Sequence, residues 1–419
     1  MTLKIGIVTG EYPPHQGGVG DFTREIAHAL ADLGHEVHVI THINARSEGF
    51  REAPRSEAER AKPFGSLTVH PIISSWNFQS LISIRQLAHN LKLDLLNIQY
   101  QAAAYGMTPP IHFLPLVAGV PSVMTFHDLR VPYLFPKAGA LRWQAILLLA
   151  KTSKGVIVTN PEDRLTLEKN LWNADDADST LRNADKLIEI PIGSNIKVNP
   201  KLQTPNSKNE ARRKYGIGED DVVIGYFGFL NSSKGGETLF RALAQLPIPL
   251  HFATGTVVTN YKLLLIGGRT GTSDLTNQAY ADQLDALANE LGILDRIIRT
   301  GYLSPEDTTQ AFFACDMMAM PYEDGASFRR GTFMACLAHG MPTITTQPSV
   351  PLPQLKHGGN VYLISPGSPI SLSSAIMELA NDSNLRAQLS RGALELSDLF
   401  TWDKIAKRTG EFFEKTIAT

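Results

Sequence analysis

The chain has 419 residues, of which 43% are hydrophobic and 19% charged, so it is long enough for two or three domains with full cores. Its formal net charge of −2 gives no reason to expect a nucleic-acid-binding surface. The two cysteines, Cys315 and Cys336, lie in apolar segments, which argues against a disulfide framework and favours buried thiols in a reducing, cytoplasmic setting.

The first forty residues have the pattern of one strand–helix–strand unit. The apolar run Leu3–Val8 is typical of a buried parallel strand, and apolar residues then recur at helical spacing over Phe22–Leu33. Asp21 is expected in the first turn or at the N-cap of this helix. Gly34 ends the helix, and Glu36–Thr41 is the next predicted strand.

A glycine loop, Gly17-Gly18-Val19-Gly20, connects the first strand to the helix. Backbone N–H groups at a helix N-terminus favour a phosphate, and glycines let it approach closely. The spacing is not the G-x-G-x-x-G dinucleotide fingerprint, so a plain NAD enzyme is the least expected reading. A tight turn that binds nothing is the alternative, because glycine-rich turns are common in α/β folds.

Strands and helices alternate through most of the chain, which predicts an α/β protein with parallel sheets. A polar stretch near residues 197–212 marks a domain boundary. Further strands are predicted at 67–73, 95–99, 121–126, 155–159 and 187–190, then at 222–227, 261–266, 297–300, 317–320 and 343–346. Helices are predicted at 81–91, 141–149, 238–246, 280–291, 305–313, 332–339 and 401–417.

No apolar run reaches the ~20 residues that a membrane-spanning helix needs. Contact with a membrane surface needs no such segment and stays open. The histidines, among them His35, His38 and His42, do not have the spacing of a closed metal site.

Seven motifs, in the same order, resemble those of the family 4 retaining glycosyltransferases of the GT-B fold, and the resemblance covers nearly the whole chain. Together the motifs carry the resemblance, although no single one decides it. They are Glu11–Gly20 with Gly34–Val39, Pro121–Asp128, Ile190–Asn195, Lys234–Leu239, Thr300–Leu303, Ala335–Pro342 and Thr401–Asp403.

The resemblance implies two Rossmann-like domains that face each other across a deep cleft. Residues 1–197, with 400–419, would form the acceptor-side domain, and residues 210–399 the domain that binds the nucleotide-sugar donor. The C-terminal helix would cross back to the N-terminal domain.

The resemblance also implies a retaining transfer of a hexose from a nucleotide-sugar to a saccharide or lipid-linked acceptor, in polysaccharide or glycoconjugate synthesis. UDP-glucose is the expected donor from its frequency in the family. No metal or other cofactor is expected. A lipid-linked acceptor would place the protein at the cytoplasmic membrane face.

Charge develops on the β-phosphate of the leaving nucleotide, where cations and backbone donors stabilise it. Lys234 is the expected point charge, and the N–H groups of the glycine loop the expected cradle. By resemblance His127 contacts the donor sugar, while Glu11 is a candidate for binding acceptor or sugar hydroxyls. The predicted catalytic residues are therefore His127, Lys234 and Glu11. The plain alternatives are a packed histidine and a solvated loop lysine.

Two positions depart from the family pattern. Phe229 stands where the family usually has a phosphate-binding arginine. Ser327 and Ala335 stand where it usually has two glutamates, and the looser alignment to Asp324 and Thr332 does not restore the pair.

Two adjacent arginines, Arg329 and Arg330, suggest a replacement for the missing cation, because guanidinium groups clamp diphosphates well. A solvated or ion-paired arginine pair is the alternative. The predicted donor-site residues are Gly17, Gly18, Val19, Gly20, Gly228, Lys234, Tyr302, Leu303, Asp324, Gly325, Ala326, Ser327, Phe328, Arg329, Arg330, Gly331 and Thr332. Asp128 and Tyr105 are predicted on the acceptor side, with core packing as the alternative for Tyr105.

Two other classes of function stay open. A GT-B epimerase would act on a nucleotide-sugar without an acceptor, whereas a phosphorylase would need inorganic phosphate or a pyridoxal lysine, for which there is no motif. The departures at Phe229, Ser327 and Ala335 also allow a non-catalytic protein with a degenerate donor site.

Overall fold

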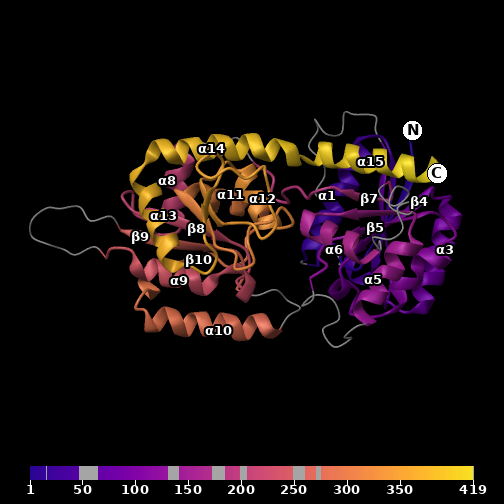
Figure 1. Ribbon diagram of the computed structural model, residues 1–419, viewed down its shortest axis with the longest axis horizontal. Coiled ribbons are helices and arrows are strands. Elements are labelled where there is room, and N and C mark those ends of the chain that lie inside the picture. The colour runs from indigo at the N-terminus through magenta and orange to yellow at the C-terminus, as the bar shows by residue number, and fades with distance from the viewer. Residues whose placement is uncertain are drawn as a thin grey trace, which may run out of the picture. The chain divides into compact units, whose positions relative to one another are not determined.

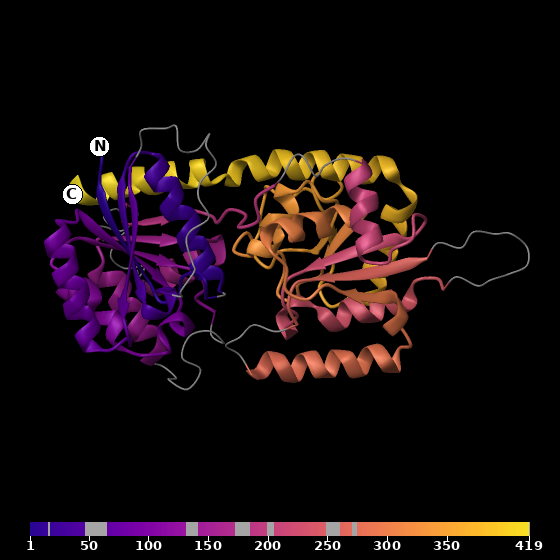
Figure 2. The same ribbon diagram turned by 180° about the vertical axis from the view of Figure 1, so that it is seen from behind.

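The computed structural model describes residues 1–15, 17–46, 65–130, 141–171, 185–198, 205–248, 260–269 and 275–418. The chain divides into two compact units, unit 1 (Met1–Gly193 with Phe400–Thr419) and unit 2 (Ser194–Leu399). In each of them helices pack on a sheet (Figures 1 and 2). The prediction of an α/β protein with two parallel sheets is therefore confirmed.

In the described part of unit 1, seven parallel strands pair in the order β3-β2-β1-β4-β5-β6-β7. The strands are β1 (Lys4–Thr9), β2 (Glu36–His42), β3 (Leu67–Ile73), β4 (Leu95–Tyr100), β5 (Ser122–Phe126), β6 (Gly155–Val158) and β7 (Leu187–Glu189). The α-helices are α1 (Gly18–Asp32), α3 (Phe78–Leu91), α4 (Leu114–Val117), α5 (Leu141–Thr152), α6 (Pro161–Leu171) and α15 (Trp402–Ala418), and 3-10 turns lie at Ile43–Arg46, Ala102–Tyr105 and Pro110–Phe113.

The alternation of side chains along each strand divides the core of unit 1 between the two faces of the sheet. Ile7 belongs to the core on one face, and its neighbour Val8 belongs to the other. Helices α1 and α15 pack on the first face, and α3 and α5 on the second. A strand buried on both faces explains why β1 reads as a continuous apolar run.

The C-terminal helix α15 completes unit 1, as the predicted helix over 401–417 implied. Phe412 and Phe413 are buried in the same core as Ile26 of α1. A Cβ atom at Gly155 would lie 2.9 Å from the Phe412 ring, so a glycine is needed where β6 and α15 meet.

In the described part of unit 2, six parallel strands pair in the order β10-β9-β8-β11-β12-β13. The strands are β8 (Val222–Phe227), β9 (Tyr261–Ile266), β10 (Ile297–Arg299), β11 (Met317–Met320), β12 (Thr343–Thr346) and β13 (Tyr362–Ile364). The α-helices are α8 (Pro205–Lys214), α9 (Gly236–Gln245), α10 (Leu275–Glu290), α11 (Pro305–Ala314), α12 (Gly331–Ala338), α13 (Pro369–Asn381) and α14 (Ser383–Ser397), and 3-10 turns lie at Ser232–Lys234, Leu294–Arg296 and Asp398–Phe400.

Some of these elements are absent from the sequence-based prediction. The polar stretch expected to be a linker instead contains α8, which an ion pair rather than an apolar stripe attaches to unit 2. Its Arg212 is buried and donates to Asp316 at 2.7 Å and to the Ala314 carbonyl at 3.2 Å. Helices α6, α13 and α14 and strand β13 were also not predicted.

Candidate functional site

Three neighbouring strands of unit 2 are each followed by a glycine with a positive φ angle. Gly228, Gly267 and Gly301, after β8, β9 and β10, have φ angles of 108°, 117° and 70°. A Cβ atom at Gly267 would lie 3.6 Å from the Gly228 Cα, and Gly267 forms a bridge with Gly301. Ligands of open α/β sheets bind at this carboxyl edge, where the glycines leave backbone accessible. We call these three residues the glycine edge.

A tight turn after β8 directs Lys234 toward the glycine edge. Lys234 ends the 3-10 turn Ser232–Lys234, and Gly235 follows with a φ of 72°. Gly235 lies so close to the Pro321 carbonyl oxygen that no Cβ atom fits there. The Lys234 Nζ lies 3.7 Å from the position of a Cβ atom at Gly228.

The charge that acts on the pKa of Lys234 is another positive charge, that of Arg330. Burial is the largest influence and the charge of Arg330 the second, and together they lower the pKa of Lys234 to about 8. Among the residues that the structure describes, no carboxylate forms an ion pair with Lys234. A partly buried ammonium beside a guanidinium is unfavourable unless an anion joins them. This arrangement is therefore suited to an anionic ligand.

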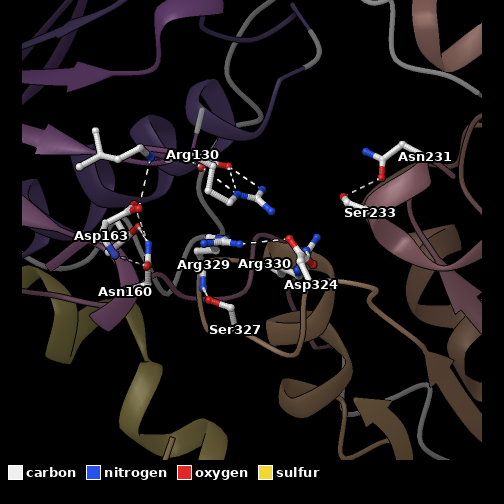
Figure 3. Close-up of polar contacts among 12 residues, drawn as sticks. Arg130, Asn160, Asp163, Asn231, Ser233, Asp324, Ser327, Arg329 and Arg330 are labelled. Carbon is white, nitrogen blue, oxygen red and sulfur yellow. Dashed lines mark hydrogen bonds and ion pairs between the residues drawn. The ribbon is translucent and has the colours of Figure 1, made fainter. Parts of the chain in front are cut away.

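Arg330 comes from the N-terminus of α12 and is 8% exposed. Its guanidinium carbon lies 4.1 Å from the centroid of the Tyr322 ring, in a cation–π contact. Asp324 forms an ion pair with Arg330, and Arg329 contacts the same carboxylate at 3.3 Å (Figure 3). Two guanidinium groups thus share one carboxylate, and Arg330 also acts on Lys234, which leaves an excess of positive charge.

Thr332 brings the start of α12 onto the glycine edge. Its hydroxyl lies 3.1 Å from the Tyr322 hydroxyl, and a Cβ atom at Gly228 would stand 2.7 Å from its methyl group. The structure thus brings together four predicted donor residues: Gly228, Lys234, Arg330 and Thr332. We call these four residues the cationic cluster.

The other predicted donor residues of unit 2 differ in their surroundings. Four of them are buried: Gly325, Ala326, Ser327 and Phe328. Three are partly exposed: Asp324, Arg329 and Gly331. The loop after β10 contains Tyr302, which is 65% exposed, and Leu303. Ser327 accepts a hydrogen bond from the Arg330 N–H through its carbonyl oxygen at 3.3 Å. Phe328 stacks on Phe333, which is a packing role.

The predicted phosphate cradle in unit 1 is wrong in part, because a side chain of the protein already binds there. Glu11 Oε1 accepts hydrogen bonds from the Val19 N–H at 3.0 Å and the Gly20 N–H at 3.2 Å. Asp21, in the first turn of α1, adds a second carboxyl group, and burial raises its pKa to about 6. Glu11 thus takes two of the N–H groups that were predicted to bind the phosphate.

His127 follows β5, and its ring nitrogen Nε2 lies 2.8 Å from Gln99 Oε1. The ring also makes an edge contact with Phe22, with centroids 4.7 Å apart. Burial lowers the pKa of His127 to about 4, against a smaller opposing effect of Asp128. His127 is therefore neutral at physiological pH and cannot supply a positive charge.

The two predicted acceptor-side residues have other contacts. Asp128 accepts hydrogen bonds from the backbone N–H of Arg130 at 3.0 Å and from its guanidinium at 2.7 Å. Tyr105 is 1% exposed, and its hydroxyl donates to the Gln99 carbonyl oxygen at 2.8 Å. The prediction of an acceptor wall at Tyr105 is wrong, because its ring packs in the core against Trp76.

In the part of the chain that the structure describes, no group of three or more His, Cys, Asp or Glu residues could hold a metal ion. A helix long and apolar enough to cross a membrane is likewise absent from the described ranges.

Sequence reasoning missed two partners of the predicted residues. Tyr322, which lies under Arg330, follows an apolar strand and carries no motif of its own. Gln99 was assigned only to a short buried strand. The sequence nevertheless indicated a polar role for Gln99, since Asn97 and Gln99 are polar residues two positions apart in an otherwise apolar strand.

Two family models match successive parts of the chain. The model of group 1 glycosyl transferases matches residues 207–395, and that of glycosyltransferase family 4 matches residues 16–175. A D-inositol 3-phosphate glycosyltransferase from Stackebrandtia nassauensis is 27% identical over 60% of this chain, and the chain spans 52% of the length of that relative.

Solved structures share the fold. A sucrose-phosphate synthase from Thermosynechococcus elongatus has a TM-score of 0.72 at 21% identity, with 99% of both chains covered. Anabaena HepE, solved in a complex with UDP and glucose, has a TM-score of 0.70 at 18% identity, with 99% of this chain and 100% of that chain covered. Both likenesses concern the arrangement of strands and helices.

Proposed function

We propose that this chain, which belongs to the family 4 glycosyltransferases of the GT-B fold, transfers a hexose from a nucleotide-sugar to a saccharide or lipid-linked acceptor. The observation that carries the proposal is Lys234, a partly buried cation whose charged neighbour is the cation Arg330. A nucleoside diphosphate carries two or more negative charges and would balance both groups. The glycine edge would let its phosphates approach the backbone.

The cationic cluster would act most strongly when the bond between sugar and phosphate breaks. Negative charge then grows on the β-phosphate, and positive groups already in place stabilise that charge without reorganisation. Lys234 and Arg330 would supply this charge, so we expect no requirement for a metal ion. Arg330 would stand in for the family arginine that Phe229 replaces.

We further propose a retaining, front-face reaction with UDP-glucose as donor. The complexes of HepE with UDP and glucose, and with UDP-glucose, support this choice for a protein of the same fold. The leaving phosphate would help to deprotonate the acceptor. His127, neutral by its lowered pKa, would bind a sugar hydroxyl rather than act as an acid.

Nucleotide binding by calorimetry tests the donor site. We expect UDP and UDP-glucose to bind, and Lys234→Met to weaken UDP by about tenfold to a hundredfold, the usual cost of a lost hydrogen bond to a charged group. Lys356→Met removes an exposed lysine of the same unit and is the matched control. If no nucleotide binds the wild-type protein, the donor site is degenerate and the proposal fails.

The reaction itself separates the transferase from an epimerase. With UDP-glucose alone, a transferase releases sugar slowly to water, and an added acceptor speeds the release of UDP. An epimerase instead converts the nucleotide-sugar with no release of UDP. Chelation of divalent ions should leave the rate unchanged if Lys234 and Arg330 neutralise the phosphates.

An apolar face of unit 1 supports the proposal of a membrane-bound acceptor. Phe78, Ile82 and Leu116 on α3 and α4 are 61%, 49% and 59% exposed, and the ring of Phe113 lies 5.8 Å from that of Phe78. Over residues 65–127 the one acidic residue is Asp94, which accepts a hydrogen bond from the Lys4 N–H.

An apolar face without acids suits the surface of an anionic bilayer, where apolar side chains enter the interface and anionic headgroups meet no repulsion. We expect the protein to sediment with vesicles of phosphatidylcholine and phosphatidylglycerol in equal parts. Replacing Phe78 and Leu116 by Ser should abolish sedimentation, whereas Ile370→Ser, at an exposed site of unit 2, should not. Equal sedimentation of all three proteins would show that this face does not contact the bilayer.

A further inference from the structure

Four polar side chains line up across two neighbouring strands of unit 1. Asn97 and Gln99 lie two residues apart on β4, and Thr125 and His127 have the same spacing at the end of β5. The strand register pairs Asn97 with Val123 and Gln99 with Thr125. Since side chains alternate between the faces of a strand, all four project from the same face of the sheet.

A backbone carbonyl fixes the direction of the hydrogen bonds in this row. The Val123 carbonyl oxygen can only accept, and Asn97 Nδ2 donates to it at 3.1 Å and to Thr125 Oγ1 at 2.9 Å. The amide oxygen of Asn97 must then face Gln99. Asn97 and Gln99 are each 1% exposed, so a reversed amide would bury two facing acceptors without water between them.

The same reasoning extends along the row to the imidazole. Gln99 Nε2 donates to the amide oxygen of Asn97, which leaves Gln99 Oε1 directed at His127. An amide oxygen has no proton to donate, so the 2.8 Å contact requires a proton on His127 Nε2.

We propose that Asn97 and Gln99 are positioning residues that hold His127 as the tautomer protonated on Nε2, which keeps Nδ1 as a hydrogen-bond acceptor for a substrate hydroxyl. The part about the hydroxyl rests on the proposed function. Among the described residues His127 Nδ1 makes no hydrogen bond. The other tautomer would set the lone pair of Nε2 against Gln99 Oε1.

Burial favours the neutral form of the His127 ring, and the charge of Asp128 opposes it more weakly. The Phe22 ring packs edge-on against it, and Asp128 is the carboxylate that acts on it electrostatically. The Asp128 carboxylate forms an ion pair with Arg130 at 2.7 Å, and its effect on His127 is smaller than that of burial. The tautomer of His127 therefore depends on the side-chain amides of Asn97 and Gln99 rather than on a neighbouring charge.

Two-bond proton–nitrogen NMR spectra of the protein labelled with ¹⁵N-histidine test this assignment directly. His127→Asn identifies the His127 signals by their loss. We expect the wild-type protein, without substrate, to show a protonated Nε2 and an unprotonated Nδ1. A proton on Nδ1, or a mixture of the two tautomers, would overturn the proposal. Because the wild-type protein is measured, the result does not depend on whether a variant at Asn97 or Gln99 folds.

Kinetics of Gln99→Met then test the positioning role. This variant keeps the volume of the side chain and removes the acceptor for Nε2–H. We expect a mixture of tautomers in the spectrum and a fall in kcat of about tenfold or more, with UDP affinity unchanged. Gln86→Met, at an exposed position of α3, is the matched control. An unchanged kcat in a Gln99→Met protein with mixed tautomers would exclude the role.

The two proposals fail in different ways. If no sugar transfer is found but Nε2 carries the proton, the tautomer assignment stands and the proposed function fails. If sugar transfer is found but the proton lies on His127 Nδ1, the proposed function stands, and Asn97 and Gln99 have no positioning role.

Discussion

The charged side chains of the cationic cluster have a cost in the ligand-free protein. Lys234 is partly buried beside Arg330, and burial and that charge both disfavour its protonated form. Such strain is typical of binding sites, where an incoming ligand supplies the missing charge. A site of this kind should therefore be a weak point for stability until the anion binds.

The pH dependence of stability follows from the lowered pKa of Lys234. Between about pH 8 and 10.5 the unfolded chain keeps a proton on this lysine that the folded protein has released. More protons are bound in the unfolded state, so the contribution of Lys234 to the free energy of unfolding rises with pH in that window. Below about pH 8 both states are protonated, and the full penalty applies.

Urea unfolding of wild type and Lys234→Met at about pH 7 and about pH 9.5 measures this contribution. The wild-type protein should gain stability relative to the variant at the higher pH, and the gain should shrink when UDP is present because phosphate raises the pKa of the lysine. The same pH dependence in both proteins would contradict the assignment.

Motifs predicted which residues of unit 2 gather, because a lysine before a glycine and a pair of arginines are visible in the sequence. Their neutral partners were not predicted. Tyr322 supports Arg330 only because β11 and α12 come together in the fold. Gln99 reaches His127 only through the register of β4 and β5, which no local pattern reveals.

At the scale of elements, the N-terminus of α1 shows how the same chemistry can serve two purposes. A helix N-terminus favours any anion, and the sequence cannot say whether a phosphate or a carboxylate takes the place. Glu11 is eight residues before Val19, and the turn between them returns its carboxylate to the helix. The glycine loop was thus predicted correctly as a loop, whereas two N–H groups of the predicted cradle, those of Val19 and Gly20, donate to Glu11.

Glu11→Gln should lower the free energy of unfolding by about 0.3–1 kcal/mol, since an amide oxygen can still accept but the charge that favours the helix dipole is lost. Glu11→Ala should cost more, about 1–3 kcal/mol, because two backbone donors lose their partner. Glu306→Gln, in the first turn of α11, is an exposed control.

Urea titrations of these three variants give the free energies, and nucleotide affinity should stay at the wild-type value. A Glu11→Gln protein of wild-type stability with greatly reduced turnover would instead return Glu11 to a catalytic role.

The elements themselves were predicted where an apolar period is strong. All the strands of both sheets except β13 follow apolar runs, so their number and order along the chain could be read from the sequence. Helix α8 has no such period, because Arg212 attaches it through an ion pair with Asp316. A helix that is held by an ion pair does not need apolar residues at helical spacing, so the apolar pattern does not predict it.

At the scale of the whole molecule, helix α15 near the end of the chain packs in the same core as strand β1 near its start. Phe413 is fully buried among Ile5, Ile26 and Val37, in unit 1. The cationic cluster lies in unit 2, which has its own sheet. A defect in α15 should therefore disturb the sheet of unit 1 while the cationic cluster keeps its geometry.

Phe413→Ala tests this separation. Loss of a buried phenylalanine leaves a cavity and should cost unit 1 about 3–5 kcal/mol. Hydrogen exchange followed by mass spectrometry should then show faster exchange in β1, α1 and β5, with β8, β11 and α12 unchanged and UDP affinity within about twofold of wild type. Lys407→Ala, on the exposed face of α15, controls for the change in the helix. Faster exchange throughout both units would mean that they unfold together, and the stability of the cationic cluster would then depend on α15 as well.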